Sequence, residues 1–223
     1  PTGNVANSER RVFVERATID AVIAACPDDQ WKLIFALARY GGLRMPSEIQ
    51  GMRWADIDWK QMRFTVRSPK TEHIEGKKTR VVPMFPELVP YFKAWQQQRS
   101  DGEPLVFPKL VKRSNLGSHA HRIIRKAGLK PWTRLFQNLR ASRETELVES
   151  FPIHVVTAWI GNSPDTAAKH YLSVLDSHFE RAVDEAPQKF GTYLGHSTAV
   201  RGCQPMTRKN EYSVQRPDGE EVG

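Results

Sequence analysis

The spacing of apolar residues changes only twice along the chain, and this pattern restricts the fold more than any other feature. Apolar residues recur at helical spacing over Asp29–Tyr40, and two glycines then end the pattern. Alternating residues occupy two short runs, Met62–Arg67 and Thr79–Met84, which predict the paired strands of a hairpin. After Pro83 the spacing is helical again. We therefore expect a mainly α fold with a small antiparallel β-sheet, in the α+β class.

Glycine, proline and capping residues divide the helical parts. The clearest boundary is GNSPD, residues 161–165, because glycine ends one helix, Ser163 can cap the next, and Pro164 fits its first turn. A turn over Trp54–Trp59 leads into the hairpin, whose connecting loop is long enough to carry function. The expected further helices are Ser47–Met52, Pro86–Arg99, Ser114–Ala127, Thr133–Ser150, Ile153–Ile160, Pro164–Tyr171 and Ser173–Glu185.

Length and composition indicate one main domain. The 223 residues, 39% of them hydrophobic, suffice for a good-sized core. We place this domain at 9–187 and a polar C-terminal tail at 188–223. No apolar run reaches the roughly 18 residues of a membrane span, and the start of the chain lacks a signal peptide's apolar core. Cys26 and Cys203 lie far apart without a metal-binding spacing. We expect a soluble, cytoplasmic protein without a membrane partner.

Positive charge is concentrated in one part of the sequence. The formal net charge is +8, and residues 104–143 contain ten Lys or Arg and no Asp or Glu. Such a stretch indicates a polyanionic partner, because each phosphate that Lys or Arg neutralises releases counterions. A nucleic acid is the expected partner; a solvated basic face is the alternative. The candidate DNA-binding residues are Lys112, Arg113, Arg122, Arg134 and Arg143.

Metal-dependent DNA cleavage fits this sequence poorly. Cleaving a phosphodiester requires neutralised charge, an activated nucleophile and a protonated leaving oxygen. Asp56 and Asp58 lie in the predicted turn, and no cluster of carboxylates accompanies them. His119 and His121 offer two ring nitrogens without a third ligand, so they are more simply surface histidines. We expect no metal; arginines acting as fixed cations are the alternative.

Five ordered features carry a resemblance. They are Arg44 in GLRMPSEI, Lys70 in SPKT, Arg140 in QNLR, Asn162 after Gly161, and Tyr171 in KHYL. In this order they resemble the tyrosine recombinase (phage integrase) family, catalytic domain, over Glu9–Glu185. The first motif has one residue more than the family's G-L-R-x-x-E-I. The resemblance implies the tyrosine recombinase catalytic-domain fold.

The resemblance also implies roles for these residues. Arg44 and Arg140 would grip the scissile phosphate with paired, charge-assisted hydrogen bonds. Lys70 would give a proton to the departing 5′ oxygen, although Lys77 and Lys78 occupy the same loop and could replace it. Tyr171 would attack phosphorus and form a 3′-phosphotyrosine that another 5′-hydroxyl can reverse. Metal, nucleotide and other cofactors are not needed. The implied activity is site-specific recombination or integration of double-stranded DNA, and with it the resemblance implies association with the nucleoid.

Two positions depart from the family. Gln137 stands where a His or Lys is usual, and Asn162 stands where a His or Trp is usual. Both amides can donate a hydrogen bond to phosphate oxygen, but an amide cannot take up and return a proton near neutral pH. A free tyrosine titrates near pH ~10, so Tyr171 needs help to lose its proton. We expect a slower recombinase in which the proton leaves through water or another histidine; His170 points about 100° away on a helix.

Two rival interpretations remain. A DNA-binding integrase remnant would keep both arginines and lack turnover. A type IB topoisomerase would share the chemistry and relax supercoils alone, and the GLRMPSEI motif argues against it. Helical signals begin within about twenty residues of Pro1, so we expect the N-terminal core-binding domain of the family to be absent from this chain. The expected assembly is a homotetramer on DNA and a monomer when free.

Overall fold

The computed structural model describes residues 12–68, 79–108, 110 and 115–163. All of them belong to one unit of the chain, Pro1–Leu175. Two helices come first, α1 (Arg16–Ala24) and α2 (Asp29–Arg39). The Asp28 side chain caps α2 by accepting a hydrogen bond from the backbone nitrogen of Trp31 at 2.8 Å. The predicted Asp29–Tyr40 helix is confirmed. Helix α1 begins within twenty residues of Pro1, where helical signals were expected to start, but its bounds were not predicted.

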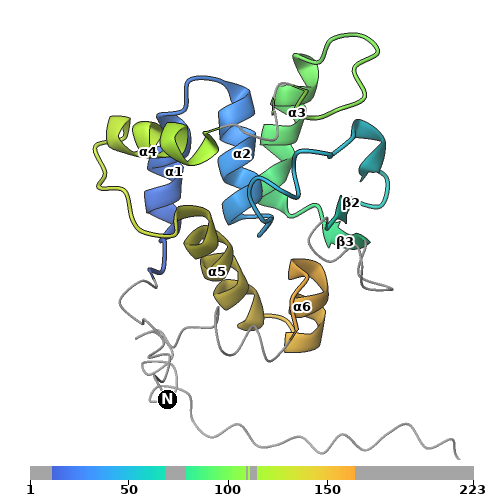
Figure 1. Ribbon diagram of the computed structural model, residues 1–223. Coiled ribbons are helices and arrows are strands. Elements are labelled where there is room, and N and C mark those ends of the chain that lie inside the picture. Colours follow the sequence, from blue (N-terminus) through green and yellow to red (C-terminus); the bar gives the residue numbers. More distant parts are fainter. Residues whose placement is uncertain (1–11, 69–78, 109, 111–114, 164–223) are drawn as a thin grey trace, which may run out of the picture. The chain divides into compact units, whose positions relative to one another are not determined.

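Helix α2 lies at the centre of the described fold. Each residue from Leu33 to Arg39 is buried, because α1, α3 (Val89–Gln97) and α5 (Leu135–Val148) all pack against it. Figure 1 shows α2 between α1 and α3, with α5 adjoining its lower end. A helix that is buried on every side serves as a fixed support for its neighbours.

The sheet has three antiparallel strands in the order β1-β2-β3. They are β1 (Ile57–Asp58), β2 (Arg63–Arg67) and β3 (Thr79–Pro83). The β2–β3 pairing confirms the predicted hairpin, and β1 arises within the segment that we expected to be only a turn. On β2, Phe64 and Val66 face the core in alternation with exposed neighbours.

The remaining elements are mostly helical, as predicted. They are the short 3₁₀ helices η2 (Trp54–Asp56) and η4 (Pro86–Leu88), followed by the α-helices α4 (Leu116–Lys126), α5 and α6 (Ile153–Ile160). Figure 1 places α6 beside β3 and α5, and it contacts both. The fold class, mainly helical with a small antiparallel sheet, is therefore confirmed. Among the described residues, no helix is both long and apolar enough to cross a membrane.

One predicted helix is wrong. Residues 47–52 form successive turns instead of the expected helix, with backbone nitrogens of Ile49 and Gln50 both bonding to the carbonyl of Pro46. Glu48, which lies within the expected helix, is only 3% exposed and takes part in an ion pair with distant Arg80. That tertiary contact accompanies isolated i→i−4 hydrogen bonds that do not extend into a regular helix. The predicted helices Pro164–Tyr171 and Ser173–Glu185 and the tail lie outside the described residues.

Candidate functional site

A buried carboxylate gathers three arginines from separate parts of the fold. Arg80 of β3 donates to both oxygens of Glu48, with Nη1–Oε1 at 2.7 Å and Nη2–Oε2 at 2.6 Å. Arg44 donates from Nη1 to Oε1 at 2.9 Å, and Nη1 of Arg140 lies 3.8 Å from Oε2. Burial opposes ionisation of Glu48, but the hydrogen bonds and charge of Arg80 and the charge of Arg140 lower its pKa to about 2. Glu48 is therefore an anion at neutral pH.

The same three arginines hold the C-terminal end of α6. Arg80 Nε donates to the carbonyl of Trp159 at 2.7 Å, Arg140 Nη2 to that of Ile160 at 2.7 Å, and Arg44 Nη2 to that of Gly161 at 2.6 Å. The last carbonyls of a helix have no partner within it, and cations are favoured at that end. Three successive carbonyls of the chain are thus satisfied by side chains from β3, α5 and the turn after α2.

Two glycines lie where the arginine side chains approach the backbone closely. Gly161 has φ +84°, a left-handed conformation that ends α6, and a Cβ added there would lie 2.9 Å from Cδ of Arg80. Gly42 has φ +64°, and its carbonyl accepts from Arg140 Nη1 at 2.7 Å. The glycine two residues before Arg44 and the glycine directly before Asn162 in the sequence motifs therefore have direct structural reasons.

The structure brings three of the predicted catalytic residues together. Arg44 and Arg140 meet at Glu48 and at the end of α6, and Asn162 follows that end directly. The arginines differ in access, since the Arg44 side chain is 24% exposed and that of Arg140 is 2% exposed. Gln137 is exposed on α5, one turn before Arg140 and on the same side of the helix. Lys70 and Tyr171, and likewise Lys77, Lys78 and His170, lie outside the described residues.

Asn162 has a partner that the sequence did not predict. Its Nδ2 donates to both oxygens of Glu144, at 2.9 and 3.1 Å, and the Glu144 side chain is completely buried on α5. Burial raises the pKa of Glu144, while the bond from Asn162 and the charges of Arg140 and Arg44 act in the opposite direction. We expected the amide nitrogen of Asn162 to face a phosphate oxygen; in the structure it faces a carboxylate.

The predicted DNA-binding residues fall into different environments. Arg122 on α4 and Arg134 before α5 are exposed, which suits a phosphate contact. Arg143 is 4% exposed, contacts Glu87 and Glu146, and lies 4.2 Å from the ring centroid of Phe85.

The prediction that Arg143 binds DNA is therefore corrected. Its guanidinium is buried in the protein interior, and burial lowers its pKa. The sequence gives its charge but not the side of α5 on which it lies. Lys112 and Arg113 are outside the described residues.

Arg80 and Glu144 are the residues that our motif search missed. Arg80 occupies a core-facing position of β3, on the same side of the strand as buried Val82. A charge at an inward position of an alternating strand was the available signal. Glu144 lies four residues after Arg140 and so shares its helix face, but nothing in the sequence marks its partner.

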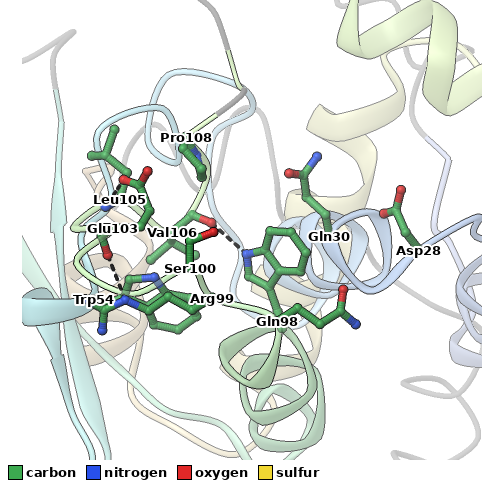
Figure 2. A pocket seen from close by; sticks show the side chains of 11 residues that line it. Asp28, Gln30, Trp54, Gln98, Arg99, Ser100, Glu103, Leu105, Val106 and Pro108 are labelled. Atoms are coloured by element: carbon green, nitrogen blue, oxygen red, sulfur yellow. Dashed lines mark hydrogen bonds between the residues drawn. The ribbon is translucent and has the colours of Figure 1, made fainter.

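A separate hollow of about 290 Å³ lies between α3, the 99–108 segment and the start of α2. Figure 2 shows Trp54, Arg99 and Glu103 lining it, and Arg99 Nε donates to the backbone carbonyl of Glu103 at 2.7 Å. None of its lining residues belongs to the arginine cluster around Glu48. In the part of the chain that the structure describes, no three His, Cys, Asp or Glu side chains gather as metal ligands.

Comparison with known proteins identifies the family of the chain. Residues 13–178 match the model of the phage integrase family. The chain belongs to this family. None of the curated proteins with which the chain was compared matches it.

Solved structures of similar fold include the XerA recombinase, with 21% identity and a TM-score of 0.64, covering 77% of this chain and 62% of that one. The Tn1549 transposon integrase, in complex with circular intermediate DNA, has 18% identity and a TM-score of 0.56 over 78% of this chain and 65% of that one. The catalytic domain of bacteriophage HP1 integrase has 19% identity and a TM-score of 0.53 over 80% of this chain and 96% of that domain. The chain thus spans less than two thirds of XerA and nearly all of the HP1 catalytic domain, and the tyrosine recombinase catalytic-domain fold is confirmed.

Proposed function

We propose that this chain cuts and rejoins double-stranded DNA at specific sites, as a metal-independent tyrosine recombinase or integrase. The convergence of Arg44 and Arg140 on Glu48 and on the end of α6 carries the proposal. Membership of the phage integrase family supports it. So does the similarity of its fold to the Tn1549 transposon integrase in complex with circular intermediate DNA and to the XerH site-specific recombinase bound to its difH substrate.

The charges of the cluster suit a phosphodiester. Arg44, Arg80 and Arg140 contribute three positive charges and Glu48 one negative charge, an excess of two that Glu144 would reduce to one when it is ionised. Arg44 uses one hydrogen of Nη1 and one of Nη2 for Glu48 and Gly161, and a guanidinium carries five N–H hydrogens. Partly exposed Arg44 would bind the phosphate directly. Arg140 behind it would add a positive charge, whose attraction for the phosphate increases as negative charge develops in the transition state.

The remaining roles follow from the family. The Tyr171 oxygen would form a bond to phosphorus as the bond between phosphorus and the 5′ oxygen breaks. Lys70 would protonate that oxygen, and the tyrosine proton would pass to water. Attack of another strand's 5′-hydroxyl would reverse the step, so no cofactor is consumed. Gln137 beside the cluster would position the phosphate without exchanging a proton, which predicts a slower enzyme than one with histidine there.

One observation favours a second candidate, the DNA-binding remnant. The amide nitrogen of Asn162 is already bonded to Glu144, so it is not directed at a phosphate. A chain with intact arginines and a misdirected amide would bind DNA without cleaving it.

Covalent trapping separates the two candidates. Duplexes made from repeats flanking the gene, each with a nick near the cleavage position, would be incubated with the wild-type chain and with Tyr171→Phe. The recombinase forms an adduct that survives denaturing gel electrophoresis and that the Phe variant lacks. A mobility shift without any adduct would establish the remnant instead.

Assembly and location are part of the proposal. We expect a monomer when free, a homotetramer on paired sites, and association with the nucleoid. Sedimentation with and without duplex measures the first two. Binding should weaken steeply with salt, because phosphate contacts release counterions.

A further inference from the structure

Asn162 bonds to Glu144 through one end of its amide only. Its Nδ2 donates to both carboxylate oxygens, at 2.9 and 3.1 Å, and Glu144 is 0% exposed. Oδ1, at the other end of the amide, is buried and has no hydrogen-bond partner among the described residues. A buried acceptor without a donor is costly, because it has lost its hydrogen bonds to water. The pair therefore leaves one polar atom unsatisfied.

The ionised state of Glu144 accounts for this arrangement. A carboxylate only accepts hydrogen bonds, so it takes both N–H groups of the amide and gives nothing to Oδ1. A protonated carboxyl group has one O–H donor and keeps an acceptor oxygen. It can form a closed pair with an amide, in which the O–H donates to Oδ1 and one N–H donates to the carboxyl oxygen. Protonation of Glu144 would thus satisfy Oδ1 and release the second N–H of Asn162.

Two nearby positive charges favour the ionised form of Glu144. Burial raises its pKa, whereas the hydrogen bond from Asn162 and the charges of Arg140 and Arg44 act in the opposite direction. In the described part of the chain, neither arginine forms an ion pair with Glu144, so both act through their charge alone. A ligand that neutralises this charge therefore favours the protonated form.

Other charged groups on the packed elements are paired with one another or exposed. They are Arg39 of α2 and Arg143 of α5, both paired with Glu146, then Arg80 of β3, paired with Glu48, and exposed His154 in the first turn of α6. Arg44 and Arg140 are accordingly the charges through which a bound anion acts on Glu144.

We propose that Glu144 takes up one proton from solvent when an anion docks on Arg44 and Arg140, and that the Asn162 amide then rearranges into a closed acid–amide pair. This inference rests on the phosphate-binding part of the proposed function. The anion neutralises the charges that favour ionised Glu144. The N–H that Asn162 releases then becomes available to an acceptor outside the pair. The buried carboxylate thereby links DNA binding to proton uptake.

The protonation state of Glu144 can be measured directly. Carboxyl ¹³C signals of the chain labelled at glutamate report it, and Glu144→Gln identifies the signal. The probe is sodium sulfate, which does not itself titrate near neutral pH, compared with sodium chloride at equal ionic strength. Sulfate should move the Glu144 titration to higher pH and leave that of exposed Glu149 unchanged. Arg44→Gln, which removes the more exposed cation, should abolish the movement.

The side-chain N–H signals of Asn162 test the rearrangement of the amide. In the ionised pair both hydrogens point to carboxylate oxygens, whereas in the closed pair only one does. The proton shifts of the two N–H groups should therefore move apart when sulfate is added at pH 7, and in the same way when acid is added in chloride. A purely structural contact between Glu144 and Asn162 would give no such change with sulfate.

Duplex affinity gives a functional readout. Because docking raises the pKa of Glu144, the complex holds more protons than the free protein between the two pKa values. Affinity for a short duplex should increase about tenfold as the pH falls through that window, beyond any increase in Glu144→Gln. Glu149→Gln is the matched control and should behave as wild type. Exposed histidines contribute equally to all three proteins, so the comparison removes their effect.

Three results would overturn the inference. One is a Glu144 titration that sulfate leaves unchanged while side-chain signals of Arg44 show bound sulfate; the phosphate-binding proposal then stands. Another is a shifted Glu144 titration without separation of the Asn162 signals, which contradicts the closed pair. The third is the absence of binding by both sulfate and duplex at Arg44 and Arg140, which removes the phosphate-binding proposal as well.

Discussion

Two buried carboxylates on either side of the end of α6 differ in almost every respect except burial. Glu48 is 3% exposed and contacts Arg44, Arg80 and Arg140, whereas Glu144 is 0% exposed and is bonded to a single amide. Interaction with arginines lowers the pKa of Glu48 to about 2, and burial raises the pKa of Glu144. One carboxylate is well compensated and the other is not.

The difference distinguishes a carboxylate whose ionised form stabilises the fold from one whose ionised form opposes folding. An anion with three cationic neighbours stabilises the turns around it. Glu144 is bonded only to an amide, and Arg140 and Arg44 act on it only through their charge, so its ionised form is less favourable to bury.

Removal of Glu48 should give the largest effect. Glu48→Gln leaves three arginines without their anion, and breaking a buried ion pair from one side typically costs about 3–5 kcal/mol of unfolding free energy. Urea unfolding at pH 7 measures this loss. Glu149→Gln, an exposed change of the same chemistry, should stay within about 0.5 kcal/mol of wild type. A loss equally small for Glu48→Gln would mean that backbone carbonyls alone hold the arginines.

Acid should narrow the difference in stability between wild type and Glu48→Gln. The folded-state pKa of about 2 lies below the ordinary value of 4.5, so the stabilisation is complete above pH 4.5 and is lost as the pH falls through about 2. The gap in unfolding free energy between the two proteins should shrink by about 3 kcal/mol across that window. Denaturant titrations at several pH values test it. A gap that is constant with pH would contradict ionised Glu48 as the stabilising group.

A methyl group at Gly161 should destabilise the protein, because it would displace Arg80, which is bonded to Glu48. Both Gly161→Ala and Gly102→Ala force alanine into a left-handed backbone, at φ +84° and +77°, which costs on the order of 1 kcal/mol. Position 102 has open space, whereas a Cβ at 161 would lie 2.9–3.1 Å from Arg80, adding about 1–3 kcal/mol by overpacking. The difference between the two variants in thermal or urea unfolding isolates the Arg80 contact. Equal losses would show that Arg80 moves aside freely.

Glu144→Gln should have the smallest effect on stability, and in the opposite direction. Because the folded-state pKa is raised, the ionised side chain opposes folding, and stability falls as the pH rises from the ordinary value of 4.5 to the raised pKa. The variant should therefore be at least as stable as wild type at pH 7.5, and any advantage should vanish near pH 4. Urea titrations of both proteins at the two pH values measure this difference in unfolding free energy. Destabilisation comparable to that of Glu48→Gln would remove the distinction between the two carboxylates.

Periodicity predicted the elements that depend on local sequence. The spans of α2, α6 and the β2–β3 hairpin follow the apolar pattern closely. The helix expected at Ser47–Met52 failed because ion pairs to distant Arg80 and Arg140 fix Glu48, and no local signal contains those partners.

The candidate site was predictable only in part. Motif order indicated Arg44, Arg140 and Asn162, and the structure brings them together. The partners of these residues come from tertiary packing, so Arg80 and Glu144 were missed. Arg143 was misplaced for the same reason, since a basic composition does not reveal which face of α5 is buried. The roles of Lys70 and Tyr171 stay predictions.

The arginines that close the end of α6 have a consequence for binding thermodynamics. A long flexible side chain that is immobilised on binding a ligand costs about 0.5–1.5 kcal/mol in conformational entropy. Arg44 and Arg140 are already fixed by peptide carbonyls and by Glu48. Their rotameric freedom is therefore lost when the protein folds, and an anion that docks on them meets a rigid, preorganised receptor.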